Sequence, residues 1–356
     1  MQRVIVGMSG GVDSAVAAYL LKRSGYDVTG LTLRTWTGAD GKESRCCEID
    51  DARAVCDVLD IPYYVRDCSG LFREKVIEPF MRDYISGITP NPCVVCNRCL
   101  KWEKMLEAAD DLGSAYIATG HYAFIEKLEN GRYTVRQALH AAKDQTYMLC
   151  DLTQQQLERT LMPLGSLSKD EVRKVAKAAG LPVADKADSQ EICFVPDDDH
   201  AGFIEENHGG PVPPEGNFVD EAGNVLGRHK GIIHYTIGQR KGLGLPMGHP
   251  VYVKRIDAEK NEVILSDDAS LYVSTVICKD INFMGTDGID DGTALKCRAK
   301  IRYRHSPENA QARMESDKLI LTFDSPVRAP APGQWAVIYD HEGHVLAGGI
   351  ICGSQP

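Results

Sequence analysis

Ser9-Gly10-Gly11-Val12-Asp13-Ser14 is the stretch that decides the fold of the first half of this chain. It follows residues 3–8, an apolar segment typical of a short buried strand, and it opens a helical pattern over residues 13–23. Glycines at such a junction let the backbone approach an anion closely, because no Cβ intervenes. The free N–H groups and the dipole of the helix start favour a phosphate. The stretch therefore predicts a strand–loop–helix unit that binds the phosphates of a nucleotide.

Three side chains of this loop support the same interpretation. The hydroxyls of Ser9 and Ser14 are further hydrogen-bond donors, and the carboxylate of Asp13 is a ligand for a Mg²⁺ ion bound to the phosphates. The string Gly-x-x-x-x-Gly-Lys-Ser/Thr of kinases and GTPases does not occur in the chain. The loop instead resembles that of ATP pyrophosphatases, which cleave ATP between the α and β phosphates and transfer AMP to an oxygen. We therefore expect ATP and Mg²⁺ at this site.

Strand and helix patterns alternate on the C-terminal side of the loop. We predict strands at 28–33, 62–65 and 115–119, and a helix at 50–59. Strands separated by helices of this length pair in parallel through right-handed crossovers, which predicts an open, doubly wound α/β sheet. A hairpin of residues 122–128 and 133–138 is expected around Asn130-Gly131. Ser168 and Glu171 have the spacing of a capping box, which predicts a helix that ends near Gly180.

The secondary-structure pattern of the sequence changes after about residue 196. Residues 209–214, Gly-Gly-Pro-Val-Pro-Pro, are typical of a linker, and short strand patterns with Gly-rich turns follow it. We expect three domains: the α/β domain at 1–208, a small β-rich domain at 209–272, and a C-terminal β-barrel or sandwich at 273–356.

Composition limits the class of protein. The 356 residues are 43% hydrophobic and 25% charged, which is typical of a folded domain protein, and the chain is long enough for two or three cores. No signal-peptide pattern and no apolar run of membrane-spanning length are present, so we expect a cytoplasmic protein without a membrane partner. The formal charge of −10 argues only weakly against a nucleic-acid partner, because binding needs only a local basic patch. No pattern indicates an oligomeric state.

Twelve cysteines in a chain without an export signal are expected to be reduced. Cys93 and Cys96 form a Cys-x-x-Cys pair after a Pro, and Cys193 lies far along the chain. Three interpretations remain open: a zinc site that would need a further ligand such as Cys99, an iron–sulfur cluster held by three thiolates, or a catalytic pair that carries sulfur as a persulfide. Cys46 and Cys47 have no assigned role. The remaining thiols are expected to be buried and inert, namely Cys56, Cys68, Cys150, Cys278, Cys297 and Cys352.

A basic stripe is predicted in the last domain. Five cations recur at every second position, which in a strand places them on one face, namely Lys296, Arg298, Lys300, Arg302 and Arg304. One interpretation is a strand that contacts the phosphates of a nucleic acid. The alternative is an edge strand whose charges prevent aggregation.

The combined motifs resemble the family of bacterial tRNA-specific 2-thiouridylases, in order and over nearly the whole chain. The matching stretches, after the loop at 7–14, are Thr89-Pro90-Asn91-Pro92, Cys96-Asn97, Ala118-Thr119-Gly120-His121-Tyr122, Lys143-Asp144-Gln145, Ile192-Cys193-Phe194 and Thr236-Ile237-Gly238-Gln239-Arg240-Lys241-Gly242. The resemblance implies ATP-dependent replacement of the C2 oxygen of the wobble uridine of tRNA by sulfur. The sulfur would come from a donor protein or from sulfide.

The resemblance also implies roles for single residues. Cys96 would be the nucleophile and Cys193 the persulfide carrier. ATP would contact Gly7, Met8, Ser9, Gly10, Gly11, Val12, Asp13, Ser14, Leu33 and Gly120. The target base or the rest of the tRNA would contact Asn91, Pro92, Cys93, His121, Lys143, Asp144, Gln145, Arg302, Tyr303 and Gln334.

Position 93 departs from the family pattern, in which aspartate is usual. Cys93, Cys96 and Cys193 together give three thiolates, the set expected of the cluster-dependent thiolases of the same superfamily. The hypothesis is that they bind a [4Fe–4S] cluster whose open iron takes the sulfur.

Overall fold

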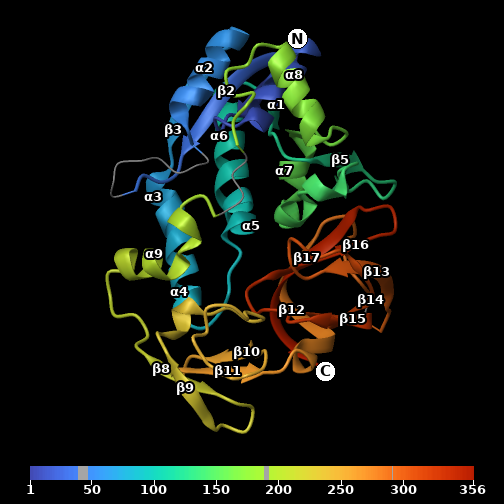
Figure 1. The fold of residues 1–356 in the computed structure, drawn as a ribbon. Coiled ribbons are helices and arrows are strands. Elements are labelled where there is room, and N and C mark those ends of the chain that lie inside the picture. Colours follow the sequence, from blue (N-terminus) through green and yellow to red (C-terminus); the bar gives the residue numbers. More distant parts are fainter. Residues whose placement is uncertain (39–46, 188–191, 291) are drawn as a thin grey trace.

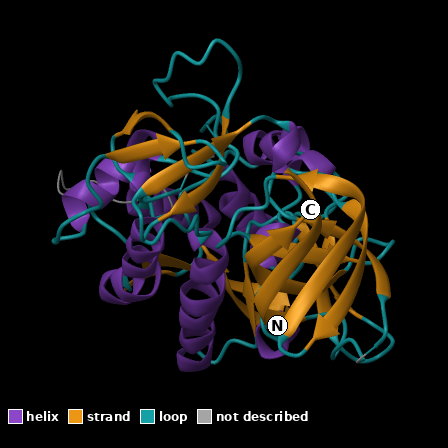
Figure 2. Ribbon diagram, turned by 90° about the horizontal axis from the view of Figure 1, so that it is seen from below, coloured by secondary structure: helices purple, strands orange, loops and turns teal. Residues whose placement is uncertain are grey.

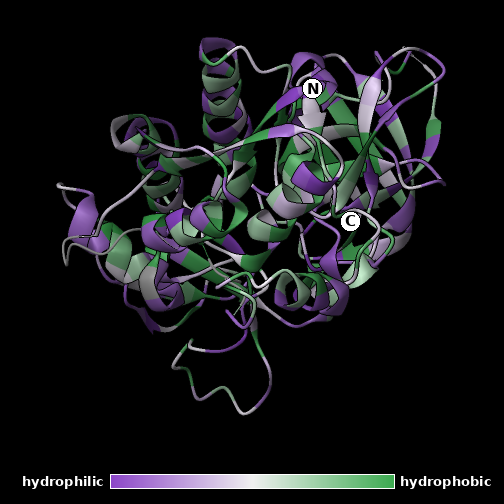
Figure 3. Cartoon of the chain, turned by 90° about the horizontal axis from the view of Figure 1, so that it is seen from above, coloured by the Kyte–Doolittle hydropathy of each residue, from purple (hydrophilic) through white to green (hydrophobic). Residues whose placement is uncertain are grey.

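The computed structural model describes residues 1–38, 47–187, 192–290 and 292–356, and arranges them in three bodies (Figure 1). A helix-covered sheet lies at the top of that view, a small β-sheet at the lower left and a barrel at the lower right. Hydrophilic and hydrophobic segments alternate along the helices of the chain (Figure 3). In the part of the chain that the structure describes, no helix is long and apolar enough to cross a bilayer.

The first body is built on a five-stranded sheet of order β3-β2-β1-β4-β7, and all neighbouring strands are parallel. The strands are β1 (Arg3–Gly7), β2 (Asp27–Arg34), β3 (Tyr63–Asp67), β4 (Tyr116–Ala118) and β7 (Thr160–Leu161). Side chains of β1 are buried on both faces of the sheet: Val4 and Val6 join one apolar cluster and Ile5 another. The first cluster contains α1 (Val12–Arg23), α2 (Ile49–Leu59) and α8 (Lys169–Ala178), and the second contains α6 (Glu103–Asp111). The predicted doubly wound α/β sheet is therefore confirmed.

Two helical runs that the sequence pattern does not predict cover residues 69–85 and 92–111. The first comprises α3 (Ser69–Phe72), a π-helical stretch at Arg73–Ile77, and α4 (Glu78–Ile85). The second begins with Pro92 at the start of α5 (Pro92–Cys96) and continues through a π-helical stretch at Asn97–Trp102 into α6. A proline fits the first turn of a helix because its missing N–H has no partner there. The Cys-x-x-Cys pair therefore lies in the first turns of a long helical run.

Local sequence signals predicted the smaller elements of the first body correctly. The hairpin pairs β5 (Ala123–Lys127) with β6 (Tyr133–Gln137), and Ser168 with Glu171 forms the capping box of α8. The remaining helices are α7 (Gln154–Glu158) and α9 (His200–Asn207), the latter just before the predicted linker.

The second and third bodies consist of β-structure. The small sheet has the order β10-β11-β8-β9, with strands β8 (Gly216–Val219), β9 (Val225–His229), β10 (Tyr252–Asp257) and β11 (Glu262–Ser266). The last body is a closed barrel of order β12-β15-β14-β13-β16-β17 (Figure 2). Its strands are β12 (Tyr272–Phe283), β13 (Leu295–Lys300), β14 (Glu308–Glu315), β15 (Lys318–Arg328), β16 (Trp335–Tyr339) and β17 (Val345–Gln355).

The prediction of five cations on one strand face is wrong. β13 ends at Lys300, and the chain then turns, so Arg302 and Arg304 lie outside the strand. Lys300 is only 7% exposed, whereas Lys296 is an exposed residue, so the two do not share an environment. A cation that tertiary packing buries cannot be recognised from the period-two pattern alone.

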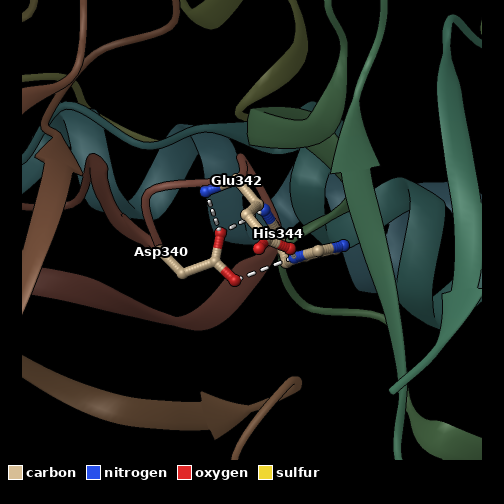
Figure 4. A group of neighbouring side chains, drawn as sticks. All are labelled: Asp340, Glu342 and His344. Carbon is tan, nitrogen blue, oxygen red and sulfur yellow. Dashed lines mark hydrogen bonds and ion pairs between the residues drawn. The ribbon is translucent and has the colours of Figure 1, made fainter. Parts of the chain in front are cut away.

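A histidine joins the hairpin to the barrel. The Nδ1 atom of His344 lies 2.8 Å from Asp340 Oδ2, and its Nε2 atom lies 2.8 Å from Glu126 Oε2 on β5 (Figure 4 shows the Asp340 side). Burial by itself lowers the pKa of His344, but the hydrogen bonds to Glu126 and Asp340 outweigh it and raise the pKa. Asp340, Glu342 and His344 have ligand atoms within 4.8 Å of one another, a spacing that a metal could use. Because both ring nitrogens face carboxylates, we interpret the group as an imidazolium between two anions.

Replacing His344 by glutamine is expected to lower the melting temperature more at pH 6 than at pH 9. A histidine whose pKa is raised by folding contributes stability that is fully present below its unfolded pKa of about 6.5. That contribution is lost as the pH rises through the folded pKa. Melting curves of both proteins across this range measure the difference. His341→Gln, an exposed neighbour in the same turn, is the control and should shift equally at both pH values. A His344→Gln difference that does not change with pH would contradict the ion-pair interpretation.

Candidate functional site

The loop between β1 and α1 is held in place by its own two hydroxyls. Ser9 Oγ and Ser14 Oγ lie 3.2 Å apart, and the Ser14 hydroxyl donates to the Gly11 carbonyl at 3.0 Å. The Gly11 N–H donates to Ser9 Oγ at 3.3 Å. Among the described residues no side chain caps α1, so the N–H groups of its first turn remain available to an anion. The loop therefore has the preformed geometry of a phosphate site.

Two glycines allow this loop to pack closely against its surroundings. Gly10 has a φ of +78°, and a Cβ there would lie 2.6 Å from the Glu48 carbonyl oxygen. Gly120 follows β4, and a Cβ there would lie 2.6 Å from both the Asp13 carbonyl carbon and the Ser14 amide nitrogen. The predicted site residue Gly120 therefore touches the loop backbone directly, although it is more than a hundred residues away in the sequence.

Asp13 is engaged by side chains from two other elements. Lys169, the first residue of α8, donates to Asp13 Oδ1 at 2.8 Å and to Oδ2 at 2.9 Å. The Tyr122 hydroxyl donates to Oδ1 at 2.7 Å. A carboxylate has about four lone-pair positions, and three are used, so Asp13 can offer a single ligand to a Mg²⁺ ion. The donor set fits an ion that is held mainly by the phosphates themselves.

A second lysine lies on the other side of the loop. Lys186 Nζ donates to the Gly10 carbonyl at 3.2 Å and to Glu48 Oε2 at 2.6 Å, and it also pairs with Asp51. Neither Lys169 nor Lys186 is predicted from the sequence as a site residue. The sequence places Lys169 directly after the helix cap Ser168, but this position does not indicate a contact with the loop. Neither lysine is close to residues 9–14 in the sequence.

The apolar residues predicted to contact ATP lie at the same end of the sheet. Met8 is 2% exposed and Val12 is 3% exposed, and both pack with α1. Gly7 ends β1, and a Cβ there would lie 3.0 Å from the Met105 sulfur. Leu33 on β2 is 8% exposed and belongs to the cluster on the opposite face of the sheet.

The cysteines of the candidate reaction site come from two segments. Cys96 is 5% exposed in α5, and Cys93 lies one turn earlier and is partly exposed. Cys193 is partly exposed and packs against the same apolar cluster that contains Cys96. Its neighbour Phe194 packs edge-on against Phe72, Phe80 and Phe203, with ring centroids 5.2 to 5.5 Å apart. These aromatic contacts fix the backbone next to Cys193.

Most of the other thiols are buried, as predicted. Burial raises the pKa of five thiols, those of Cys56, Cys68, Cys150, Cys278 and Cys297. The prediction for Cys352 is wrong, because this residue is exposed near the end of the barrel strand β17. Of the cysteines without an assigned role, Cys47 is buried and Cys46 lies outside the described residues. Cys99 is half-buried, and burial raises its pKa.

Several residues predicted to meet the substrate hold the domains together in this structure. Gln334 Nε2 donates to the carbonyls of Thr89 and Pro90 at 3.0 and 3.1 Å, next to Asn91 and Pro92. Arg302 Nη2 donates to the Ile237 carbonyl at 3.1 Å and also to the Ala329 carbonyl. These bonds join the barrel to the cysteine-bearing helix and to the central body.

The remaining predicted contacts surround the hairpin. His121 lies beside the Trp102 ring, with Nδ1 at 2.9 Å from Thr119 Oγ1, and burial lowers its pKa to about 3. Lys143 ends a short 3₁₀ turn, and the buried Asp144 accepts from the Thr146 hydroxyl at 2.8 Å. Gln145 Oε1 accepts from the Tyr122 N–H at 2.9 Å, and Tyr303 lies near Tyr147 at a ring distance of 6.1 Å.

Comparison with protein families gives three consecutive matches. Residues 2–197 match the tRNA methyl transferase HUP domain, residues 203–267 match the tRNA methyl transferase PRC-barrel domain, and residues 273–351 match the aminomethyltransferase beta-barrel domain.

Curated relatives match the chain from end to end. Proteins called tRNA-specific 2-thiouridylase MnmA from Lachnoclostridium phytofermentans and Clostridium beijerinckii are 49% and 48% identical to it. Both alignments cover 98% of this chain, and they cover 99% and 98% of the two relatives. Among solved structures, the U34-tRNA thiolase NcsA from Methanococcus maripaludis with its [4Fe-4S] cluster is 19% identical, with a TM-score of 0.36. That alignment covers 59% of this chain and 67% of the other.

Replacing Gly120 by alanine is expected to weaken ATP binding at least tenfold, because the added Cβ would push the loop away from its place at Asp13 and Ser14. Titration calorimetry with ATP measures the effect. Gly70→Ala is the matched control, since a Cβ at Gly70 meets nothing within 4 Å. Unchanged ATP affinity in Gly120→Ala would show that the nucleotide binds elsewhere.

Proposed function

The chain belongs to the family of tRNA-specific 2-thiouridylases, and from this premise we propose that it replaces the C2 oxygen of the wobble uridine in tRNA by sulfur. ATP is converted to AMP and pyrophosphate in the reaction. One observation carries the proposal: a single domain contains both a phosphate loop after the central strand β1 and two cysteines, Cys96 and Cys193, that pack with the same apolar cluster. Methyl transfer, which the family descriptions mention, needs neither ATP cleavage nor a pair of thiols.

The loop residues serve the first step of the proposed reaction. The C2 oxygen of the uridine attacks the α phosphate of ATP, and pyrophosphate leaves. N–H groups at the start of α1 and the hydroxyls of Ser9 and Ser14 bind the departing phosphates, whose negative charge they stabilise. Lys169 and Lys186 lie close enough to the loop to exchange their carboxylate partners for phosphate oxygens. A Mg²⁺ ion that binds with ATP and takes Asp13 as a ligand would neutralise further negative charge of the phosphates.

The cysteines serve the second step. A persulfide on Cys193 attacks C2 through its outer sulfur, and AMP leaves as the C–S bond forms. Cys96 then attacks the inner sulfur of this adduct, which releases 2-thiouridine and forms a Cys96–Cys193 disulfide. A dithiol reductant restores both thiols. The target base has to leave the anticodon stack to reach these groups, and Asn91, Pro92 and Cys93 are the residues we propose to receive it.

Three thiols also fit an iron–sulfur cluster. Cys93 and Cys96 lie one helical turn apart, and Cys193 packs against the apolar cluster to which Cys96 belongs. We propose that the three thiolates converge from these two segments on one cluster. A [4Fe–4S] cluster held by them would supply an open iron that carries the transferred sulfur. In that case Cys96 and Cys193 are ligands, and the outer persulfide and the disulfide are not needed.

The RNA partner is proposed to lie across the first body and the barrel. His121, Lys143, Asp144 and Gln145 would contact it from the sheet side, and Arg302, Tyr303 and Gln334 from the barrel side. We further propose the boundaries 1–208, 209–272 and 273–356 for the three domains. Action on tRNA is consistent with the expected cytoplasmic location.

The proposed function is tested by anaerobic reaction of the protein with tRNA and ATP, with either sulfide or a persulfide donor plus a dithiol. We expect 2-thiouridine by nucleoside mass spectrometry, with an equal amount of AMP, and none without ATP. Cys96→Ala and Cys193→Ala should each abolish the product. Cys352→Ala, an exposed thiol of the barrel, should retain full activity. A tRNA product without added sulfur under both conditions would overturn the proposal.

The cluster is tested by anaerobic purification. We expect a brown protein with iron and sulfide near four per chain, about the stoichiometry of a [4Fe–4S] cluster. Cys93→Asp should lose the iron and the colour while keeping the melting temperature close to that of the wild type. A colourless wild-type protein that forms thiouridine from the persulfide donor would instead favour the Cys96–Cys193 disulfide route.

A further inference from the structure

Lys300 is a buried cation at the end of β13. Its side chain is 7% exposed, and its register partner is Val337 on β16. Its Nζ atom lies 5.5 Å from the centroid of the Tyr303 ring and 5.9 Å from that of Tyr147. The described residues give the ammonium group no hydrogen bond and no ion pair within 4.0 Å. Lysine is almost never this buried without a partner.

The surroundings compensate only part of the charge. Contacts with two aromatic faces stabilise a cation by less than the burial of an unpaired ion destabilises the fold. Burial lowers the pKa of Lys300, and the Asp144 carboxylate counteracts this from a distance. That carboxylate already accepts from the Thr146 hydroxyl and from the Ala138 N–H. The chain therefore maintains an uncompensated positive charge here at the expense of stability.

Other cations add to the positive field at this place. Arg302, Lys300 and Arg328 all lower the pKa of His305, after burial as the largest cause. Arg302 and Arg328 are committed to protein partners: Arg302 to two carbonyls, and Arg328 to Asp268 at 2.8 Å. Lys300 is thus the cation of this group that remains available to a ligand.

The two tyrosines connect Lys300 to the proposed base site. The Tyr147 hydroxyl donates to the Trp335 carbonyl at 2.8 Å and also has a side-chain hydrogen bond with Asn91. Burial raises the pKa of Tyr303, and the charges of Asp144 and Cys93 raise it further, which places Tyr303 near Cys93. The two tyrosines beside Lys300 therefore lie next to the proposed base site: Tyr147 bonds to Asn91, and Tyr303 lies near Cys93.

We propose that Lys300 binds the phosphodiester group next to the flipped uridine, with Tyr303 as an aromatic surface beside it. This inference rests on the proposed function. A phosphate supplies the negative charge that the site lacks, and a polyanionic RNA brings it only when the substrate docks. Aromatic rings beside a cation are a common arrangement for an extruded nucleotide. The positive charge of Lys300 then stabilises the RNA complex relative to the free protein.

The test measures binding of a labelled anticodon stem-loop RNA by fluorescence anisotropy as a function of salt. Lys300→Met and Lys300→Gln should both weaken binding about tenfold and flatten the slope of log Kd against log salt by about 0.7 to 0.9. The control Lys296→Met removes the same charge from the exposed start of the same strand and should change Kd by less than twofold. Lys300→Met should also raise the melting temperature of the free protein by about 2 °C or more, since the unpaired charge is removed.

The outcomes separate this inference from the proposed function. RNA affinity and salt slope that equal those of the wild type in both Lys300 variants would overturn the inference, even when the wild type forms 2-thiouridine. A lower melting temperature together with weaker RNA binding would also overturn it, because it would indicate a structural role. Weaker binding of ATP alone, measured without RNA, would assign Lys300 to the nucleotide phosphates instead. Wild-type protein that binds RNA with the expected salt slopes but adds no sulfur would contradict only the proposed reaction.

Discussion

The contact between Gly120 and the phosphate loop is the constraint on which the arrangement of the site depends. No side chain fits between Gly120 and the backbone of Asp13 and Ser14, so the end of β4 has to lie against the start of α1. This contact follows from the strand order β2-β1-β4, in which β1 has a neighbour on each side. Ligands of doubly wound sheets bind where the strand order reverses. The loop therefore lies at the place where the topology itself opens a crevice.

The segment that follows Gly120 connects the loop with the barrel through a series of hydrogen bonds. Tyr122 bonds to Asp13, the hairpin meets the barrel through Glu126 and His344, and Tyr147 bonds to the barrel at Trp335. Residues 120–149 thus contact the nucleotide loop at one end and the barrel at the other. This segment is therefore one connection between the loop and the barrel, beside the hydrogen bonds of Gln334 to Thr89 and Pro90.

Domain contacts and proposed substrate contacts overlap in this protein. A neutral hydrogen bond contributes about 1 kcal/mol, but a buried carbonyl left without its donor costs about 1–3 kcal/mol. Arg302 and Gln334 each donate to two carbonyls, so removing either side chain would disturb the placement of the barrel. Loss of RNA binding in such variants would not by itself identify a direct contact. Lys300 is easier to interpret because none of the described carbonyls accepts a hydrogen bond from it.

Local signals account for what the sequence predicted correctly. The loop, the hairpin and the capped helix α8 depend on residues that are neighbours in the chain, so the pattern of side chains is enough to recognise them. β7 has two residues and offers no pattern, and the helical runs between 69 and 111 were not recognised. Lys169 and Lys186 approach the loop only through tertiary packing. The burial of Lys300 depends on where β13 ends. The sequence pattern does not show that end, because the alternating cations continue to Arg304.

The three lysines of the site differ in how a ligand would change their free energy. Lys169 and Lys186 have carboxylate partners, so a phosphate at the loop exchanges one anion for another at a small net gain. Among the described residues, Lys300 has aromatic faces and a distant carboxylate but no ion-pair partner, so a phosphate bound as proposed would remove an existing penalty. The charges of Lys169 and Lys186 are thus paired before the nucleotide binds, whereas the charge of Lys300, at the proposed RNA contact, has no paired anion among the described residues. Such a difference makes occupancy of the RNA end depend strongly on charge, which suits a partner that is a polyanion and a protein whose own net charge is −10.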